Sequence, residues 1–82
     1  MRVPLRRFLF DLWLNEGISY GFGTFGSGVC LSLWIDEEDD YSMKKIEDIV
    51  AEILKNYPKV LNGGWKSEAD GSSFYMLDVS GV

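Results

Sequence analysis

One amphipathic segment in the middle of the chain constrains its fold more than any other sequence feature. Apolar residues recur at helical spacing between Met43 and Tyr57, and most of the intervening positions are charged. Ser42 is a suitable N-cap, and Pro58 ends the helix because the residue before a proline avoids helical backbone angles. The pattern predicts a helix over about 42–56 whose apolar face must pack against another layer.

A β-hairpin is expected before this helix. Apolar residues alternate with small ones over 18–22, and a second alternating segment covers 29–35. The intervening sequence Gly-Ser-Gly at 26–28 has the residue types of a turn. The alternation sets the aliphatic residues of the second strand on one face, and Cys30 and Trp34 on the other.

A second hairpin is expected after the helix. Segments 65–68 and 73–79 flank the sequence Ala-Asp-Gly-Ser at 69–72, and an Asp-Gly pair between apolar segments is a strong hairpin signal. The sequence Asn-Gly-Gly at 62–64 indicates a further turn ahead of this hairpin.

The segment 5–14 fits two structures. Its high aromatic content and alternation favour a strand, whereas Pro4 before it and Gly17 after it are typical helix boundaries. We favour the strand and keep the helix as the alternative, since short apolar runs do not distinguish the two by periodicity.

The elements together predict a single α+β domain over residues 1–82. Its antiparallel sheet has four to five strands, and the single amphipathic helix at about 42–56 packs on one face. The order is βββαββ, or the same order with a helix as its first element. No internal repeat or linker is evident in the 82 residues, a length that supports one small core.

The residue types present exclude much chemistry. The chain contains no histidine, so neither a Ser-His nor a Cys-His nucleophile pair exists. Cys30 is the only cysteine, which excludes an internal disulfide and favours a reducing, cytoplasmic setting. No apolar stretch approaches the roughly 20 residues that span a bilayer. We expect no enzyme activity, no catalytic residues, no cofactor and no membrane association.

Two motif-like spacings lack the context that their chemistry requires. Residues 21–26 match G-x-G-x-x-G, but a strand is expected to follow where a phosphate site needs a helix N-terminus. Oxygen-bearing side chains recur from Asp36 to Glu47 at the spacing of a calcium-binding loop. Tyr41 stands where that loop needs glycine, so no metal site is expected.

Acidic residues dominate the surface character. The chain has 13 acidic and 8 basic residues, a net charge of −5, and seven acids fall within 36–48. These seven are Asp36, Glu37, Glu38, Asp39, Asp40, Glu47 and Asp48. An acidic surface repels nucleic acid and attracts a basic protein. Aromatic residues make up 15% of the chain, more than one small core readily hides, and Trp34 beside the acidic run is a candidate anchor.

These features favour a non-enzymatic interaction protein that binds and blocks a basic partner, such as a nucleic-acid-binding effector. The profile resembles that of phage-type inhibitors of host defence complexes, namely anti-CRISPR and anti-restriction proteins that mimic nucleic acid. It is also similar to that of immunity proteins and antitoxins. A further alternative is a small-ligand-binding module in which Tyr20, Phe22 and Phe25 of the segment 20–28 form a pocket wall. The surplus aromatic residues also allow a homodimer.

Overall fold

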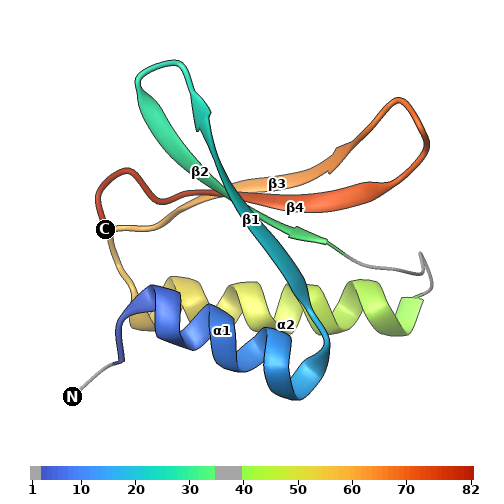
Figure 1. The fold of residues 1–82 in the computed structure, drawn as a ribbon, viewed down its shortest axis with the longest axis horizontal. Coiled ribbons are helices and arrows are strands. Elements are labelled where there is room, and N and C mark those ends of the chain that lie inside the picture. The colour runs from blue at the N-terminus through green and yellow to red at the C-terminus, as the bar shows by residue number, and fades with distance from the viewer. Residues whose placement is uncertain (1–2, 35–39) are drawn as a thin grey trace.

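The computed structural model describes residues 3–34 and 40–82, apart from the side chain of Phe25. Over these residues the elements are α1 (Leu5–Glu16), β1 (Ser19–Phe25), β2 (Gly28–Trp34), α2 (Asp40–Asn56), β3 (Leu61–Ser67) and β4 (Ser73–Asp78). The strands form one antiparallel sheet in the order β1-β2-β4-β3. Both helices lie on the same side of this sheet (Figure 1). The α+β class is therefore confirmed.

An αββ unit occurs twice in this arrangement. Helix α1 precedes the hairpin β1–β2, and helix α2 precedes the hairpin β3–β4. The two hairpins join through β2 and β4, which pair antiparallel at the centre of the sheet. The repetition is one of element order and was not expected from the sequence, in which no repeat is evident.

The prediction of a strand over 5–14 was wrong, because this segment forms α1. The carbonyl of Pro4 accepts the N–H groups of Arg7 and Phe8 at 3.0 and 3.1 Å, which starts the helix. Gly17 ends it with a left-handed φ of 69° and donates its N–H to the Trp13 carbonyl. The order is thus αββαββ rather than βββαββ, and two helices cover the sheet instead of one.

Helix α2 confirms the predicted helix at 42–56 but begins two residues earlier, at Asp40. Ser42 therefore lies within the first turn and is not the N-cap. The predicted apolar face is buried against the sheet, with Ile46 and Ile53 fully inaccessible. The six largest fully buried side chains among the described residues come from both helices and the two central strands: Leu9, Leu31, Leu33, Ile46, Ile53 and Leu77.

The turn expected at 62–64 was also wrong, since these residues belong to β3. The pairing of β3 with β4 shifts between Asn62 and Gly64, which marks a β-bulge. Gly64 has a φ of 83°, and a Cβ at Gly63 would lie only 2.6 Å from the Met76 carbonyl oxygen. Gly64 thus permits a left-handed backbone angle and Gly63 permits the close approach of β4. Turns also require glycine for these reasons, which is why the sequence resembles a turn.

Candidate functional site

One face of the sheet carries no helix within the described chain (Figure 1). Leu31 and Leu33 of β2, and Tyr75 and Leu77 of β4, are buried against the helices. The alternate residues of these central strands therefore point to the other side. We call this surface the open face; its central side chains are Cys30, Ser32, Trp34, Phe74 and Met76.

Two aromatic rings form the main feature of the open face. Trp34 of β2 is the register partner of Phe74 of β4. Their rings stack with centroids 4.6 Å apart and an interplanar angle of 30°. Both side chains are half-buried. Such a pair is pre-ordered by the sheet, so a partner that packs on it orders few additional rotamers.

The flank of the open face on β1 is largely bare backbone, whereas on the other flank Lys66 of β3 is the register partner of Phe74. Gly21 and Gly23 of β1 lie opposite Ser32 and Cys30 in the register. A Cβ at Gly23 would meet the Cys30 Sγ at 3.6 Å. The tips of both hairpins turn away from the helices (Figure 1). Trp34 and Phe74 lie at the end of β2 and near the start of β4, away from the tip of the β1–β2 hairpin.

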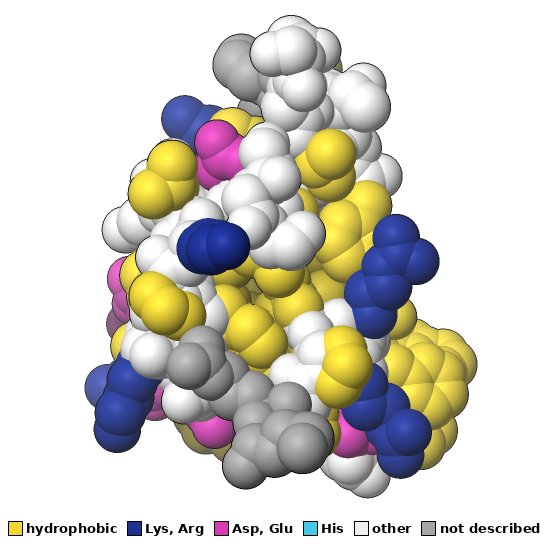
Figure 2. Space-filling model, turned by 90° about the vertical axis from the view of Figure 1, so that its left-hand side faces the viewer, with side chains coloured by type: hydrophobic (Ala, Val, Ile, Leu, Met, Phe, Trp, Pro, Cys, Tyr) yellow, Lys and Arg dark blue, Asp and Glu magenta, His cyan; other side chains and the backbone are white. Residues whose placement is uncertain are grey.

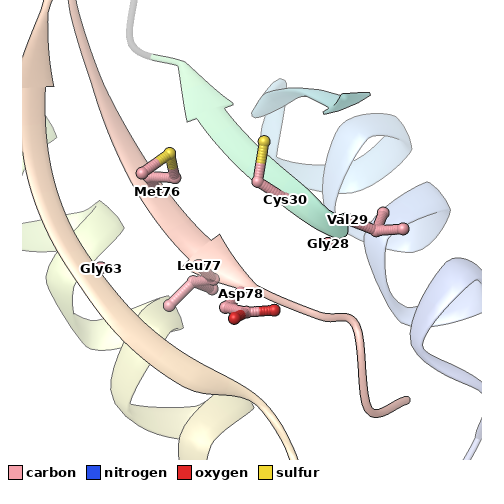
Figure 3. A pocket seen from close by; sticks show the side chains of 7 residues that line it. All are labelled: Gly28, Val29, Cys30, Gly63, Met76, Leu77 and Asp78. Atoms are coloured by element: carbon pink, nitrogen blue, oxygen red, sulfur yellow. The ribbon is translucent and has the colours of Figure 1, made fainter. Parts of the chain in front are cut away.

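A hollow of about 220 Å³ opens beside the central strands (Figure 3). It is lined by Gly28, Val29, Cys30, Gly63, Met76, Leu77 and Asp78. The sulfur-bearing side chains of Cys30 and Met76 point the same way from neighbouring strands (Figure 3). The hollow is therefore apolar and sulfur-rich on the open face.

Asp78 at the rim of this hollow is held by the chain that follows it. Its Oδ1 accepts the N–H of Ser80 at 2.9 Å, and hydrogen bonds from Ser80 lower the pKa of the Asp78 carboxyl. The Ser80 hydroxyl oxygen in turn accepts the N–H of Val29 at 2.8 Å. Asp78 is thus a fixed negative charge at the edge of the hollow.

Of the acidic residues singled out in the sequence, Glu47 and Asp48 do not share the face that carries Trp34. Asp36, Glu37, Glu38 and Asp39 lie outside the described residues. Asp40 begins α2 and is exposed. Glu47 and Asp48 lie exposed on α2, in the layer on the other side of the sheet from Trp34.

Basic side chains also reduce the acidity of this helix surface. Lys44 Nζ lies 3.9 Å from Asp48 Oδ1. Lys45 Nζ lies 2.7 Å from Glu16 Oε2, and the hydrogen bond to Glu16 raises the pKa of Lys45. The described part of α2 therefore presents mixed charge, and Lys45 ties it to the end of α1.

The proposed aromatic pocket wall at 20–28 is divided between two sides of the sheet. Tyr20 packs partly buried against the core. Phe22 is 43% exposed, and its ring packs edge-on against that of Tyr20 on the helix side, with the ring centroids 6.1 Å apart. The neighbouring Gly21 and Gly23 belong to the open face. Aromatic rings and bare backbone therefore do not line one pocket here, and the Phe25 side chain is outside the described part.

Phe22 instead borders a second hollow at one end of the molecule. This hollow of about 390 Å³ is lined by Pro4, Leu5, Arg6, Phe22, Val29, Val79, Ser80 and Val82. Figure 2 views this end, where hydrophobic side chains gather between lysine and arginine side chains. The Arg6 guanidinium carbon lies 5.6 Å from the centroid of the Phe22 ring, within cation–π range.

Sequence reasoning did not select Phe74 and Met76. Their alternation with Tyr75 and Leu77 was visible and placed both on one face of the last strand. What the sequence did not provide was the strand order, since only the pairing of β2 with β4 sets Phe74 opposite Trp34.

No family model matches the chain, and no curated protein or solved structure shows significant similarity to it. Across residues 3–34 and 40–82, no helix has the length and apolar character needed to cross a membrane. Within the same residues, no group of three or more Cys, Asp or Glu side chains is arranged to hold a metal ion.

Proposed function

We propose that the protein is a small, non-enzymatic interaction protein whose open face binds a basic protein partner. The observation that carries this proposal is the stacked pair of Trp34 and Phe74 on a sheet face that the helices leave uncovered. Tryptophan and other aromatic side chains in ordered surroundings are the residue types that contribute most to protein interfaces.

Charge supports a basic partner. Strand β2 ends at Trp34, and five acidic residues in succession, 36–40, follow it closely in the chain. The whole chain carries a net charge of −5. Carboxylates near an apolar anchor steer a positively charged partner during association and favour one orientation of docking.

The partner class that fits this chemistry is a nucleic-acid-binding protein whose basic groove the carboxylates occupy in place of phosphates. The protein would then act by blocking that groove, as anti-CRISPR and anti-restriction inhibitors of phage type do. The hollow on the open face, at about 220 Å³, is smaller than the roughly 300–1,000 Å³ of typical small-molecule pockets. At the open face, the size of the hollow therefore favours a protein partner over a small ligand.

The test is affinity capture from cell extract with three forms of the protein: wild type, Trp34→Ala and Tyr41→Ala. Tyr41 is the matched control, because it is an aromatic residue that is 76% exposed on α2, in the helix layer. The captured protein is identified, purified and titrated against each form. Its nucleic-acid-binding activity is then measured with and without the wild-type protein.

The proposal expects one basic protein that wild type and Tyr41→Ala retain in stoichiometric amount and that Trp34→Ala loses. Stoichiometric inhibition of its nucleic-acid binding supports the blocking mechanism. A neutral or acidic partner, or equal retention by Trp34→Ala, contradicts the proposal. A basic toxin as the captured protein would place the chain among immunity proteins or antitoxins.

A further inference from the structure

The two edge strands of the sheet differ in their protection against further pairing. At one edge, β3 carries the bulge between Asn62 and Gly64 and the charged residue Lys66. Bulges and lysines are the usual devices that block an edge. The other edge, β1, pairs with β2 over all seven of its residues without a register shift. Its sequence, SYGFGTF, contains no charge and no proline.

The free hydrogen-bonding groups of β1 follow from the pattern on β2. The Val29 carbonyl accepts the N–H of Val79, beside the end of β4, and so points away from β1. Alternate residues of an antiparallel strand bond to opposite neighbours. The β1 residues opposite Val29, Leu31 and Leu33 therefore direct their N–H and C=O groups outward. These residues are Thr24, Phe22 and Tyr20.

Helix α1 has a second apolar face beside this edge. Leu5 and Leu9 are buried in the core, yet Phe10, Trp13 and Leu14 are 46%, 52% and 62% exposed. The rings of Phe10 and Trp13 lie against each other, with their centroids 5.9 Å apart. A helix that is apolar on more than its core-facing side normally packs against a second surface.

The helix face and the strand edge form one continuous surface. Arg6 stands one helical turn before Phe10, and its guanidinium lies over the ring of Phe22 at 5.6 Å. Figure 1 looks directly at this side of the molecule, where β1 and α1 lie nearest the viewer and α2 lies behind. Of the nine large hydrophobic residues exposed in the described chain, four belong here: Phe10, Trp13, Leu14 and Phe22.

We propose that this surface binds a second copy of the chain. A two-fold axis normal to the sheet pairs β1 antiparallel with β1 of the second copy, so that four strands from each copy form one sheet. The same axis sets the two α1 helices side by side and antiparallel.

Charges on α1 favour this occupant. The helix has no acidic residue in its first turn and no basic residue in its last turn. Arg6 and Arg7 instead lie at its start and Glu16 at its end, which opposes the helix dipole. An antiparallel second α1 brings the arginines of each copy toward the acidic, negative end of the other. Glu16 also bonds Lys45 of its own chain, so the antiparallel arrangement adds a second cation near this carboxylate in both copies, as a two-fold interface requires.

The symmetry also sets the expected register. Phe22 is the central residue of β1 (Ser19–Phe25). Full overlap of the two strands puts Phe22 on the axis, with Tyr20 of each copy opposite Thr24 of the other. Gly21 and Gly23 lie on the other face, so the Phe22 rings meet on the helix side.

The first experiment measures the mass of the purified chain in solution by analytical ultracentrifugation over a dilution series. It compares wild type with Thr24→Pro and Thr24→Val. Proline removes an outward N–H and is tolerated at an edge strand, whereas valine keeps that N–H. Two hydrogen bonds are lost across the axis, so Thr24→Pro should weaken the dimer by at least about tenfold, and Thr24→Val should not.

The second experiment tests the helix half of the surface without changing the strand. Leu14→Glu introduces a charge into the apolar contact in both copies, and we expect it to weaken the dimer by at least about tenfold. Tyr41→Glu adds the same charge at another exposed residue, on α2, and should leave the dimer intact. Circular dichroism confirms that each variant is folded.

Hydrogen exchange gives a third readout. The amides of Tyr20, Phe22 and Thr24 should exchange slowly at high protein concentration and rapidly on dilution. A wild-type chain that is monomeric throughout the dilution series overturns the proposal. The proposal is overturned even if the β1 edge of that monomer is found to pair with a strand of a different protein. A dimer that survives both Thr24→Pro and Leu14→Glu also overturns it, as does one that Tyr41→Glu disrupts equally.

Discussion

Trp34 and Phe74 stack across the two central strands, with ring centroids 4.6 Å apart, on the side of the sheet opposite α1 and α2. Stacked rings on an open sheet stabilise the strand pair and present apolar surface at the same time. The two contributions are separable, because folding is measured on the protein alone and binding requires a partner.

A double-mutant cycle on Trp34→Ala and Phe74→Ala should show coupling. Aromatic pairs contribute about 0.5–1.5 kcal/mol beyond the area that they bury. We therefore expect the double variant to be about 1 kcal/mol more stable than the sum of the single losses implies. Urea denaturation of the four proteins gives the value. Additive losses would show that the rings do not interact in solution.

Gly63→Ala should destabilise the fold by about 1–3 kcal/mol, as overpacking usually does. The added Cβ would lie 2.6 Å from the Met76 carbonyl oxygen, which is backbone and cannot rotate away. Gly21→Ala is the matched control, because nothing lies within 4 Å of a Cβ there, and it should stay within about 0.5 kcal/mol of wild type. Thermal denaturation of both variants distinguishes them, and equal stabilities would contradict the close strand approach.

The elements that the sequence predicted correctly are those with a complete local signal. Helix α2 has an unbroken apolar stripe and a proline stop, and the β3–β4 hairpin has its Asp-Gly turn. The segment that forms α1 carries apolar residues on more than one side, so its periodicity was ambiguous. Its boundary residues, Pro4 and Gly17, were the better guide.

The parts of the site that could not be predicted depend on tertiary pairing. The face that carries Trp34 followed from alternation, but its contact with Phe74 required the strand order. The Asn62-Gly63-Gly64 sequence has the residue types of a turn. Only the pairing with β4, which brings the Met76 backbone close to Gly63, shows that these residues form a bulge within a strand. By contrast, the predicted helix already placed Glu47 and Asp48 in the helix layer, and grouping them with Trp34 by charge overlooked this.

The pKa of Asp70 should lie below the ordinary value for an aspartate. Asp70 Oδ1 accepts the Ser72 hydroxyl at 2.7 Å and the Ser72 N–H at 2.9 Å, and these bonds favour the charged carboxylate. The pKa is lower in the folded state, so the stabilisation is complete above the unfolded-state pKa and is lost as the pH falls through the folded-state pKa.

An NMR titration of the carboxyl carbons measures this pKa directly. Ser72→Ala removes the hydroxyl donor, which is the larger cause, and should raise the pKa of Asp70 toward its ordinary value. The Asp78 carboxyl, held by Ser80, serves as the internal control and should keep its low pKa in this variant. An ordinary Asp70 pKa in wild type would mean that the turn does not hold in solution.

Charge reversal should affect partner binding according to distance from the open face. Glu37 and Glu38 follow Trp34 by three and four residues, and four residues of chain reach at most about 14 Å. Reversing both to lysine should weaken binding and reduce its salt dependence. Reversing Glu47 and Asp48 together is the matched control, because both lie on α2, on the side of the sheet opposite the open face. This double reversal should have the smaller effect on binding.

Folding should be little changed when Glu47 and Asp48 are reversed, since both are exposed and exposed ion pairs contribute about 0–1 kcal/mol. Melting temperatures close to wild type confirm that any loss of binding is not a loss of structure. A larger effect from Glu47 and Asp48 would move the binding surface to the helix layer.

The central claim is that the open face is where the partner binds, and NMR mapping with the purified partner tests it most directly. We expect the signals of the Trp34 indole, the Phe74 ring and the Met76 methyl to shift or broaden on titration. The exposed residues in the second half of α2, such as Glu52 and Lys55, should be unchanged. Changes confined to the helices, with the Trp34 and Met76 signals unaltered, would contradict the account.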